Sequence, residues 1–388
     1  MTEPREIFFD AIEYQQRIDK VREEMVKAGV DLLIMTNPTH VCYLVGHFTQ
    51  AVNDLMFLAL PMEGTPFLQL PQFEHPRNHV SGVGAEVVSS WNLGTNPADA
   101  VVREIERRGL RSGSTAVEVS GSYTPFTVIA QLLDGLDAKP LQNLVDEIRL
   151  VKSSSELTYL REAARMTDAG TQAALDSFRE GAVDHDVAAS SLAALVSSGS
   201  EALTVDPYIC FGWRTAAPHT NRGGDVAQAE DPLFIELGAS RARYTAPLMR
   251  SAVATRTTTA LTELADVSDE IISAVCDTTK AGVPVAEVAA AGRKAIEPIL
   301  SRVLWHHTYG YSVGLSFAPT WADCSHFLIN EQNKGVLEAG MVFHLPTQIR
   351  VDRQYGAGFS ETIIVTERPN QITKSLFKID RQTYFCTP

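Results

Sequence analysis

The chain has 388 residues, of which 45% are hydrophobic and 21% are charged, and its 47 acidic and 33 basic residues give a formal net charge of −14. Such a surface repels nucleic-acid phosphates and anionic membranes, and no apolar run approaches the roughly 20 residues that cross a bilayer, so we expect neither partner. Five scattered cysteines without CxxC spacing and a polar, acidic start predict a reducing, cytoplasmic setting without a secretory signal.

The first 150 residues alternate short apolar runs with amphipathic helical patterns, which is typical of an α/β domain. Apolar residues at helical spacing predict a first helix over 14–28, and the apolar run that follows it ends at Asn37 and Pro38. Further helices are expected near 97–108 and 126–133, and strands over 31–35, 56–60, 67–70 and 116–119.

A second domain is expected to begin near residue 151. Ser153 with Glu156 three residues later fits a capping box, and a long amphipathic pattern follows it. We therefore predict domains over 1–150 and 151–388, the second of mixed helix and antiparallel strand, which is an α+β arrangement. Its other helices are expected near 187–196, 261–279 and 285–300, and two of its strands near 341–345 and 362–366.

The stretch 231–252, DPLFIELGASRARYTAPLMRSA, predicts a β-hairpin because two apolar runs flank Gly238 and a polar turn. Glu236 stands inside the first of these runs. A carboxylate in an apolar strand loses much of its solvation, so it is paired, bound to a metal or kept for chemistry.

Several motifs together give the chain a family resemblance. The segments EIRLVKSSSELTYLREAARMTDAG, FIELGASRARYTAPLMR, GYSVGLSFAPTW, GMVFHLP and GFSETIIVTE occur in this order. Their order and spacing resemble those of the creatinase and aminopeptidase P (M24) superfamily. The resemblance implies an α/β creatinase-type N-terminal domain, an α+β "pita-bread" C-terminal domain, and a homodimer in which the N-terminal domain caps the neighbour's pocket. Residues 46–54 and 72–78, taken as polar loops, are the candidates for that cap.

The resemblance also brings departures at the positions of metal ligands. Metallopeptidases of this fold hold two divalent ions with two aspartates, a histidine and two glutamates. The matching positions here carry Glu236, Pro247, Tyr311, Pro346 and either Ser360 or Glu361. Because proline has no side-chain donor atom, this set predicts no metal and no other cofactor.

Within the superfamily, the chain looks most similar to the metal-independent ectoine hydrolase branch. It shares the APH sequence ending at His219, a glutamate ahead of a Tyr-x-x-Pro-Leu-x-Arg segment, Gly-Tyr-x-x-Gly-Leu-Ser and a Met-x-Phe-His strand. This likeness implies hydrolysis of a C–N bond in a small non-peptide compound, such as an ectoine-like cyclic amidine. Glu236 would be the nucleophile or base and His219 the acid or base. The substrate-binding candidates are Tyr244, Tyr311, His344, Glu361 and Arg250.

Other functions stay open at this point. A creatinase-like amidinohydrolase is one, although its two pocket glutamates fall at Met249 and Pro346. A catalytically inactive binding or scaffold protein is another. A metallo-aminopeptidase or prolidase is disfavoured by Pro247 and Pro346, and Arg250 with Glu361 could instead form a structural ion pair.

Overall fold

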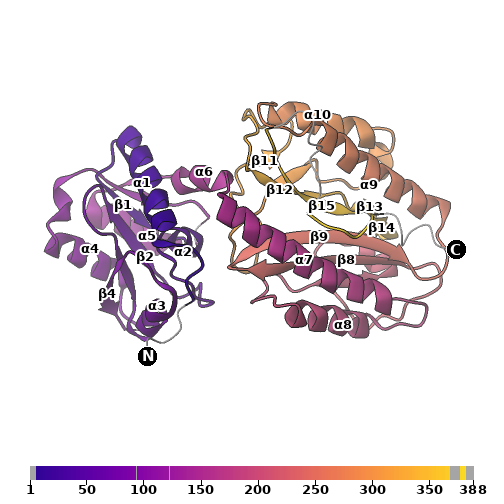
Figure 1. Ribbon diagram of the computed structural model, residues 1–388, viewed down its shortest axis with the longest axis horizontal. Helices are drawn as coiled ribbons and strands as arrows, with labels where there is room; N and C mark the ends of the chain where they lie inside the picture. The colour runs from indigo at the N-terminus through magenta and orange to yellow at the C-terminus, as the bar shows by residue number, and fades with distance from the viewer. Residues whose placement is uncertain (1–5, 93, 122, 368–375, 382–388) are drawn as a thin grey trace. The chain divides into compact units, whose positions relative to one another are not determined.

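The N-terminal unit, residues 1–149, is built on a six-stranded sheet with strand order β4-β3-β2-β1-β5-β6. The computed structural model describes residues 6–92, 94–121, 123–367 and 376–381 (Figure 1). In β1 (Leu32–Met35), Leu33 and Met35 pack into one apolar cluster with the first two helices, and Leu32 and Ile34 pack into another with the fourth and fifth. Because successive strand side chains point to opposite faces, this alternation places helices on both sides of the sheet. The α/β class predicted for this half is confirmed.

The elements of this unit follow the predicted ranges, with some additions. Its helices are α1 (Ala11–Ala28), α2 (Pro38–Val45), α3 (His75–Ser81), α4 (Pro97–Arg107), α5 (Phe126–Leu136) and α6 (Leu144–Leu150), with 3-10 turns η1 (Gln72–Glu74) and η2 (Leu110–Ser112). Its strands after β1 are β2 (Phe57–Pro61), β3 (Phe67–Pro71), β4 (Glu86–Trp91), β5 (Thr115–Glu118) and β6 (Lys139–Leu141).

Two differences from the predictions have local causes. The range 72–78 is not a polar loop, because η1 and the start of α3 occupy it. The helix α2 was not predicted because all of its residues are buried, so it shows no alternation of polar and apolar faces. Asn37 marks its start, since the Asn37 side chain accepts a hydrogen bond from the Thr39 backbone N–H at 2.9 Å.

The C-terminal unit, residues 150–388, contains three sheets in its described part. Their strand orders are β7-β8-β9, β11-β10-β12-β15 and β13-β14. The helices are α7 (Ser154–Ser177), α8 (Asp184–Ser197), α9 (Thr259–Thr278) and α10 (Val285–Ile296), with 3-10 turns η3 (Gly212–Ala216) and η4 (Leu300–Arg302). The strands are β7 (Tyr208–Phe211), β8 (Pro232–Arg241), β9 (Tyr244–Val253), β10 (Gly310–Ser312), β11 (Leu328–Ile329), β12 (Val342–Pro346), β13 (Ile349–Val351), β14 (Tyr355–Ala357) and β15 (Ser360–Ile364).

Two local predictions for this unit, the capping box and the hairpin, are confirmed. Ser153 accepts a hydrogen bond from the Glu156 backbone N–H, and the Glu156 carboxylate accepts one from the Ser153 N–H, which together form the capping box of α7. The predicted hairpin is the antiparallel pair β8 and β9, with Glu236 in register with Met249. Antiparallel strands and segregated helices give the α+β class.

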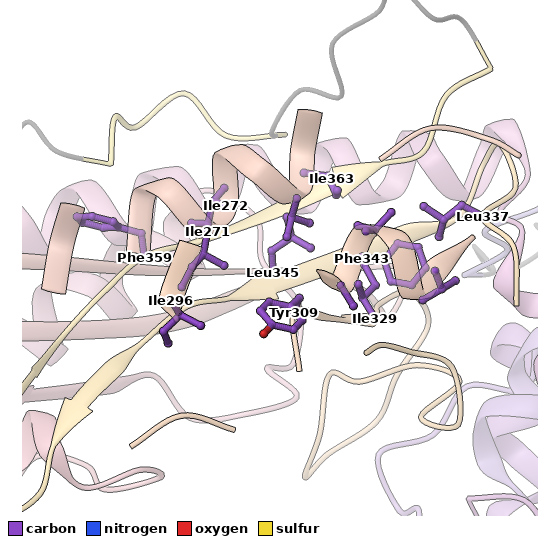
Figure 2. Close-up of a cluster of buried hydrophobic side chains, with 14 of the residues drawn as sticks. Ile271, Ile272, Ile296, Tyr309, Ile329, Leu337, Phe343, Leu345, Phe359 and Ile363 are labelled. Carbon is purple, nitrogen blue, oxygen red and sulfur yellow. The ribbon is translucent and has the colours of Figure 1, made fainter. Parts of the chain in front are cut away.

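Two helix layers cover the sheets of this unit, and Figure 1 shows α7 and α8 along β8 and β9, and α9 and α10 along β12 and β15. Figure 2 shows Phe343 and Leu345 of β12 together with Ile271 and Ile272 of α9 in one apolar cluster. Because side chains alternate along a strand, His344, between Phe343 and Leu345, faces away from these helices. Within the described residues, no helix is long and apolar enough to cross a membrane.

Candidate active site

Glu236 lies in the middle of β8, between Tyr208 of β7 and Met249 of β9 as its cross-strand neighbours. The residues on either side of it, Ile235 and Leu237, belong to the apolar cluster under α7 and α8. Strand alternation therefore turns the Glu236 side chain to the face away from those helices. The sequence expectation of a carboxylate inside an apolar strand is confirmed, since Glu236 is 7% exposed.

Glu236 opens into a cavity of about 410 Å³. This volume is in the range of small-molecule sites, and the wall is mainly apolar with a few polar groups, as such sites usually are. The wall consists of Pro218, His219, Glu236, Met249, Leu304, Trp305, His306, Tyr311, Pro346, Gln348 and Arg350.

Burial raises the pKa of Glu236 from 4.5 to about 8, and the nearby Arg350 acts in the opposite direction. Burial dominates because the cavity wall removes water from the carboxylate, while the single guanidinium restores only part of the lost stabilisation. At neutral pH the carboxyl group is therefore mostly protonated, and once ionised it is a stronger base than an ordinary carboxylate. Such a perturbed group in a cavity is the usual mark of a functional site.

Tyr311 of β10 brings a phenol to the same cavity. Burial, and then the negative charge of Glu236, raise the pKa of Tyr311 well above 10, so the phenol stays protonated. The Trp321 Nε1–H donates to the Tyr311 oxygen at 2.7 Å, which leaves the phenolic O–H for a donor role. Behind Tyr311 lies His344, with ring centroids 5.3 Å apart, and burial lowers the pKa of His344 to about 3. His344 is thus a neutral packing partner and does not line the cavity.

His219 lies on the loop that follows η3 and forms an exposed part of the cavity wall. Its φ of 55° is in the left-handed region, which is strained for a residue with a β-carbon and often occurs at functional sites. The ring of Tyr208 is its aromatic neighbour, with centroids 6.3 Å apart. The structure thus brings His219, Glu236 and Tyr311 together, as the sequence predicted.

Tyr244, Arg250 and Glu361 do not line the cavity, contrary to the expectation that they bind substrate. Arg250 is the cross-strand partner of Ile235, and Glu361 is the partner of Leu345, so both sit on the faces covered by helices. They form the structural ion pair left open above, with Arg250 Nη2 2.9 Å from Glu361 Oε1.

Tyr244 lies six residues before Arg250 on β9, so its side chain points to the same face of the sheet. The Tyr244 hydroxyl donates to the Glu156 carboxylate at 2.8 Å. This bond ties β9 to the first turn of α7. We therefore assign Tyr244 to the packing of the helix on the sheet.

Four polar residues of the wall are not predicted by the sequence motifs: Trp305, His306, Gln348 and Arg350. The first two follow η4 in an irregular segment, and the stacked rings of Trp305 and His306 lie 4.3 Å apart. Gln348 and Arg350 come just after the His344 strand, at alternate positions of a short apolar run. That alternation was the available signal for a cavity role. Gln348 and Arg350 lie two and four residues after Pro346, so on an extended chain their side chains point to the same side as Pro346.

The donor atoms at this site do not fit the two-metal centre of metallopeptidases that have this fold. Among the side chains of the wall Glu236 is the carboxylate, Pro346 has no donor atom and Glu361 faces the other side of its strand. In the part of the chain that the structure describes, a group of three close ligand-type side chains occurs instead in the N-terminal unit, as His40, Glu118 and Asp146. There His40 Nε2 lies 2.9 Å from Asp146 Oδ1.

Comparisons with known proteins find similar chains along almost the whole length. A protein of Sinorhizobium fredii described as an uncharacterized hydrolase/peptidase is 27% identical over 369 residues, which cover 88% of this chain and 90% of the relative. The Xaa-Pro dipeptidase of Lactobacillus delbrueckii subsp. lactis is 23% identical, and the match covers 90% of this chain and 94% of that dipeptidase. Among solved structures, dipeptidase PepE from Mycobacterium ulcerans has a TM-score of 0.82 at 23% identity, with 96% of this chain and 98% of that chain covered.

These relatives contradict the predicted function. The sequence predicted metal-independent hydrolysis of a non-peptide C–N bond in an ectoine-like substrate. The predicted bond is wrong, because the named relatives are dipeptidases, which cleave peptide bonds. Metal independence has no support from them, nor has the ectoine hydrolase branch. In the sequence, Pro247 and Pro346 disfavour the prolidase alternative because they replace metal ligands, yet a change of ligands does not reveal which bond is cleaved.

Two family models match the chain in order. The creatinase/prolidase N-terminal domain matches residues 17–151, and metallopeptidase family M24 matches residues 158–367. These matches and the neighbouring structures agree with the predicted creatinase-type and pita-bread domains, which are confirmed as the fold. The chain belongs to metallopeptidase family M24.

Proposed function

We propose that the protein hydrolyses the amide bond of a dipeptide-sized substrate in the Glu236 cavity. The observation that carries this proposal is the single buried carboxylate, with its pKa raised to about 8, in a cavity of about 410 Å³ beside a neutral phenol. The cavity size suits a small ligand. The relatives named as Xaa-Pro dipeptidases support the peptide bond as the target.

Glu236 is the general base of this reaction. Its ionised carboxylate takes a proton from a water molecule while the water oxygen attacks the carbonyl carbon of the amide. The same proton then passes to the amide nitrogen as the C–N bond breaks, so the products are a carboxylic acid and an amine. A carboxyl group with a pKa of about 8 suits both transfers, because it holds and releases a proton near neutral pH.

Tyr311 stabilises the tetrahedral intermediate. Its raised pKa keeps the O–H in place, and a neutral donor in the cavity wall stabilises the negative charge that develops on the carbonyl oxygen. His219, at the exposed part of the wall, is the candidate to relay this same proton from Glu236 to the departing nitrogen. A homodimer, and a cap formed by residues 46–54 of the neighbour, stay predictions.

Purified protein is expected to release free amino acids from dipeptides. A panel of Xaa-Pro and Xaa-Ala dipeptides would be incubated with the protein as purified and after addition of Mn²⁺, Zn²⁺ or Mg²⁺, with products quantified by mass spectrometry. Tetrapeptides of matching sequence serve as controls and should be cleaved more slowly, because the cavity holds a small ligand. Absence of cleavage in every arm would reject the proposal, and tight binding without cleavage would favour a binding protein.

The rate should depend on pH through Glu236. Because the ionised form is the active base and burial raises its pKa to about 8, kcat should rise about tenfold per pH unit from pH 6 and level off above pH 8. We choose kcat rather than kcat/KM, since the free α-amino group of a dipeptide titrates in the same range. A rate already level at pH 6, as an ordinary carboxylate would give, would contradict the assignment.

A further inference from the structure

Three buried side chains, His40, Glu118 and Asp146, lie together at the carboxyl ends of two parallel strands of the N-terminal unit. Glu118 is the last residue of β5 and is in register with Met35, the last residue of β1. His40 follows β1 in α2, and Asp146 comes from α6. Atoms of the three side chains that can bind a metal lie within 4.8 Å of one another.

The chain turns to opposite faces of the sheet after these two strands. After β1 it enters α2, whose Val41 and Leu44 pack in the apolar cluster on one face. After β5 it leads to α5, whose Ile129 and Leu132 pack in the cluster on the other face. Open α/β sheets usually bind their ligands where the connections diverge in this way, outside the carboxyl ends of adjacent parallel strands. The topology thus places the three side chains where a site is expected.

Asp146 fixes the orientation of the His40 ring. His40 Nε2 lies 2.9 Å from Asp146 Oδ1, and Arg149 Nη1 donates to the same oxygen at 3.1 Å. Because this oxygen is an acceptor, His40 Nε2 carries the hydrogen and the other ring nitrogen, Nδ1, presents a lone pair. A carboxylate that holds one nitrogen of an imidazole is the usual partner of a histidine whose second nitrogen binds a metal.

The lone pair of His40 Nδ1 is met by another acceptor. Glu118 Oε2 lies 3.6 Å from this nitrogen, and neither side chain is exposed to solvent. Neither atom has a hydrogen-bond partner among the described residues. The other oxygen, Glu118 Oε1, accepts from the Val145 backbone N–H at 3.0 Å, which holds the carboxylate in place. Two buried acceptors side by side without a donor are costly, so a cation between them is expected.

The separation of the two atoms distinguishes a metal ion from a proton. Burial raises the pKa of Glu118, which favours a proton, but a hydrogen bond spans roughly 2.7–3.2 Å between its heavy atoms. Zinc bonds to nitrogen and oxygen at about 2.0–2.2 Å, so two of its tetrahedral ligands lie roughly 3.3–3.5 Å apart. The observed 3.6 Å is closer to the metal geometry. An imidazole with a carboxylate suits zinc, whereas Mg²⁺ and Ca²⁺ prefer oxygen ligands.

We propose that the N-terminal unit binds one divalent transition metal ion, best Zn²⁺, with His40 Nδ1 and Glu118 Oε2 as its ligands and Asp146 as the group that orients the histidine. The ion links the end of β5 to the first turn of α2 and stabilises this unit. The site lies outside the Glu236 cavity wall, and the inference is independent of the proposed hydrolysis.

The test measures zinc in the full-length protein. Protein produced in zinc-supplemented medium, and the same protein after EDTA treatment and prolonged incubation with Zn²⁺, is dialysed and analysed by inductively coupled plasma mass spectrometry. A stoichiometric amount of zinc is expected, together with a higher melting temperature than that of the EDTA-treated protein. Zinc should also slow hydrogen–deuterium exchange in peptides covering 38–45 and 115–118. Absence of zinc from the wild type overturns the inference and leaves a proton between the two acceptors.

Glu118→Gln removes a ligand and keeps the shape of the side chain and its acceptor for Val145 N–H. It should weaken zinc binding by more than about 100-fold, whereas Asp146→Asn, which changes only the orienting group, should weaken it by about 10–100-fold. Circular dichroism verifies that each variant folds. Equal zinc binding by the wild type and Glu118→Gln overturns the inference.

Glu86→Gln is the matched control, because it makes the same change in the same unit at a side chain that is 54% exposed. It should leave zinc binding unchanged. Glu236→Gln distinguishes the two units of the chain and should also bind zinc as the wild type does. Loss of zinc in Glu236→Gln with full binding in Glu118→Gln would assign the ion to the Glu236 cavity and reject the site at His40.

Discussion

Replacing Glu236 with glutamine is expected to lower kcat by about 10²–10⁴-fold, the range that a general base contributes. Glutamine has nearly the shape of glutamic acid, and the wild-type group is mostly protonated at neutral pH, so the fold should be unchanged. The variant lacks only the ability to accept and return a proton. Single-turnover rates on a cleaved dipeptide measure the chemical step, and calorimetry verifies that the substrate still binds.

The same substitution should also change how the free energy of unfolding depends on pH. Because the pKa of Glu236 in the folded protein, about 8, is above its ordinary value of 4.5, the contribution of Glu236 to the free energy of unfolding is fully present below pH 4.5. It is lost as the pH rises through 8. The loss reaches about 5 kcal/mol at most, from 1.36 kcal/mol per pKa unit. Glu236→Gln should therefore become more stable than the wild type as the pH rises from 5 to 9.

Glu338→Gln is the control for both effects, since Glu338 is exposed and outside the cavity wall. It should leave kcat and the pH dependence of stability unchanged. Normal kcat in Glu236→Gln would remove Glu236 from the mechanism. A stability difference between wild type and Glu236→Gln that stays constant from pH 5 to pH 9 would show that its pKa is ordinary. The gain in stability would mean that the fold tolerates a buried carboxylate because catalysis needs it.

The elements of the fold were predictable because their signals are local. The capping box at Ser153 and Glu156, and the apolar runs on both sides of Gly238, each lie within a few residues of the feature that they predict. The helix α2 was not predictable in this way, since full burial removes its polar face. Its position depends on packing with distant parts of the chain.

The site was predictable only in part because motifs identify positions, whereas strand parity decides which way each side chain points. Glu236 and Tyr311 were recognised from the motifs and do face the cavity. Arg250 and Glu361 come from equally strong motifs, but each is one residue out of phase with the cavity face. Arg350 has no motif, and only the pairing of β13 with β14 and the return of the chain toward β8 bring it beside Glu236.

The ion pair of Arg250 and Glu361 should matter for stability and not for substrate binding. Glu361→Leu is expected to destabilise the C-terminal unit by about 3–5 kcal/mol, because it leaves a buried guanidinium without its carboxylate. Hydrogen–deuterium exchange of peptides covering 244–253 and 360–364 measures this locally, which avoids assuming a two-state transition for a chain with two units.

The surface pair of Arg302 and Glu263, 2.7 Å apart with side chains 57% and 42% exposed, provides the comparison. Breaking it with Glu263→Leu should leave stability almost unchanged, because water screens exposed charges. The double variant Arg250→Met with Glu361→Leu should recover much of the lost stability, since no charge is then left unpaired. The folded fraction of Glu361→Leu should keep the wild-type kcat/KM on dipeptides. A large fall in kcat/KM with unchanged exchange rates would instead return Glu361 to the substrate site, against the strand parity that places it on the helix-covered face.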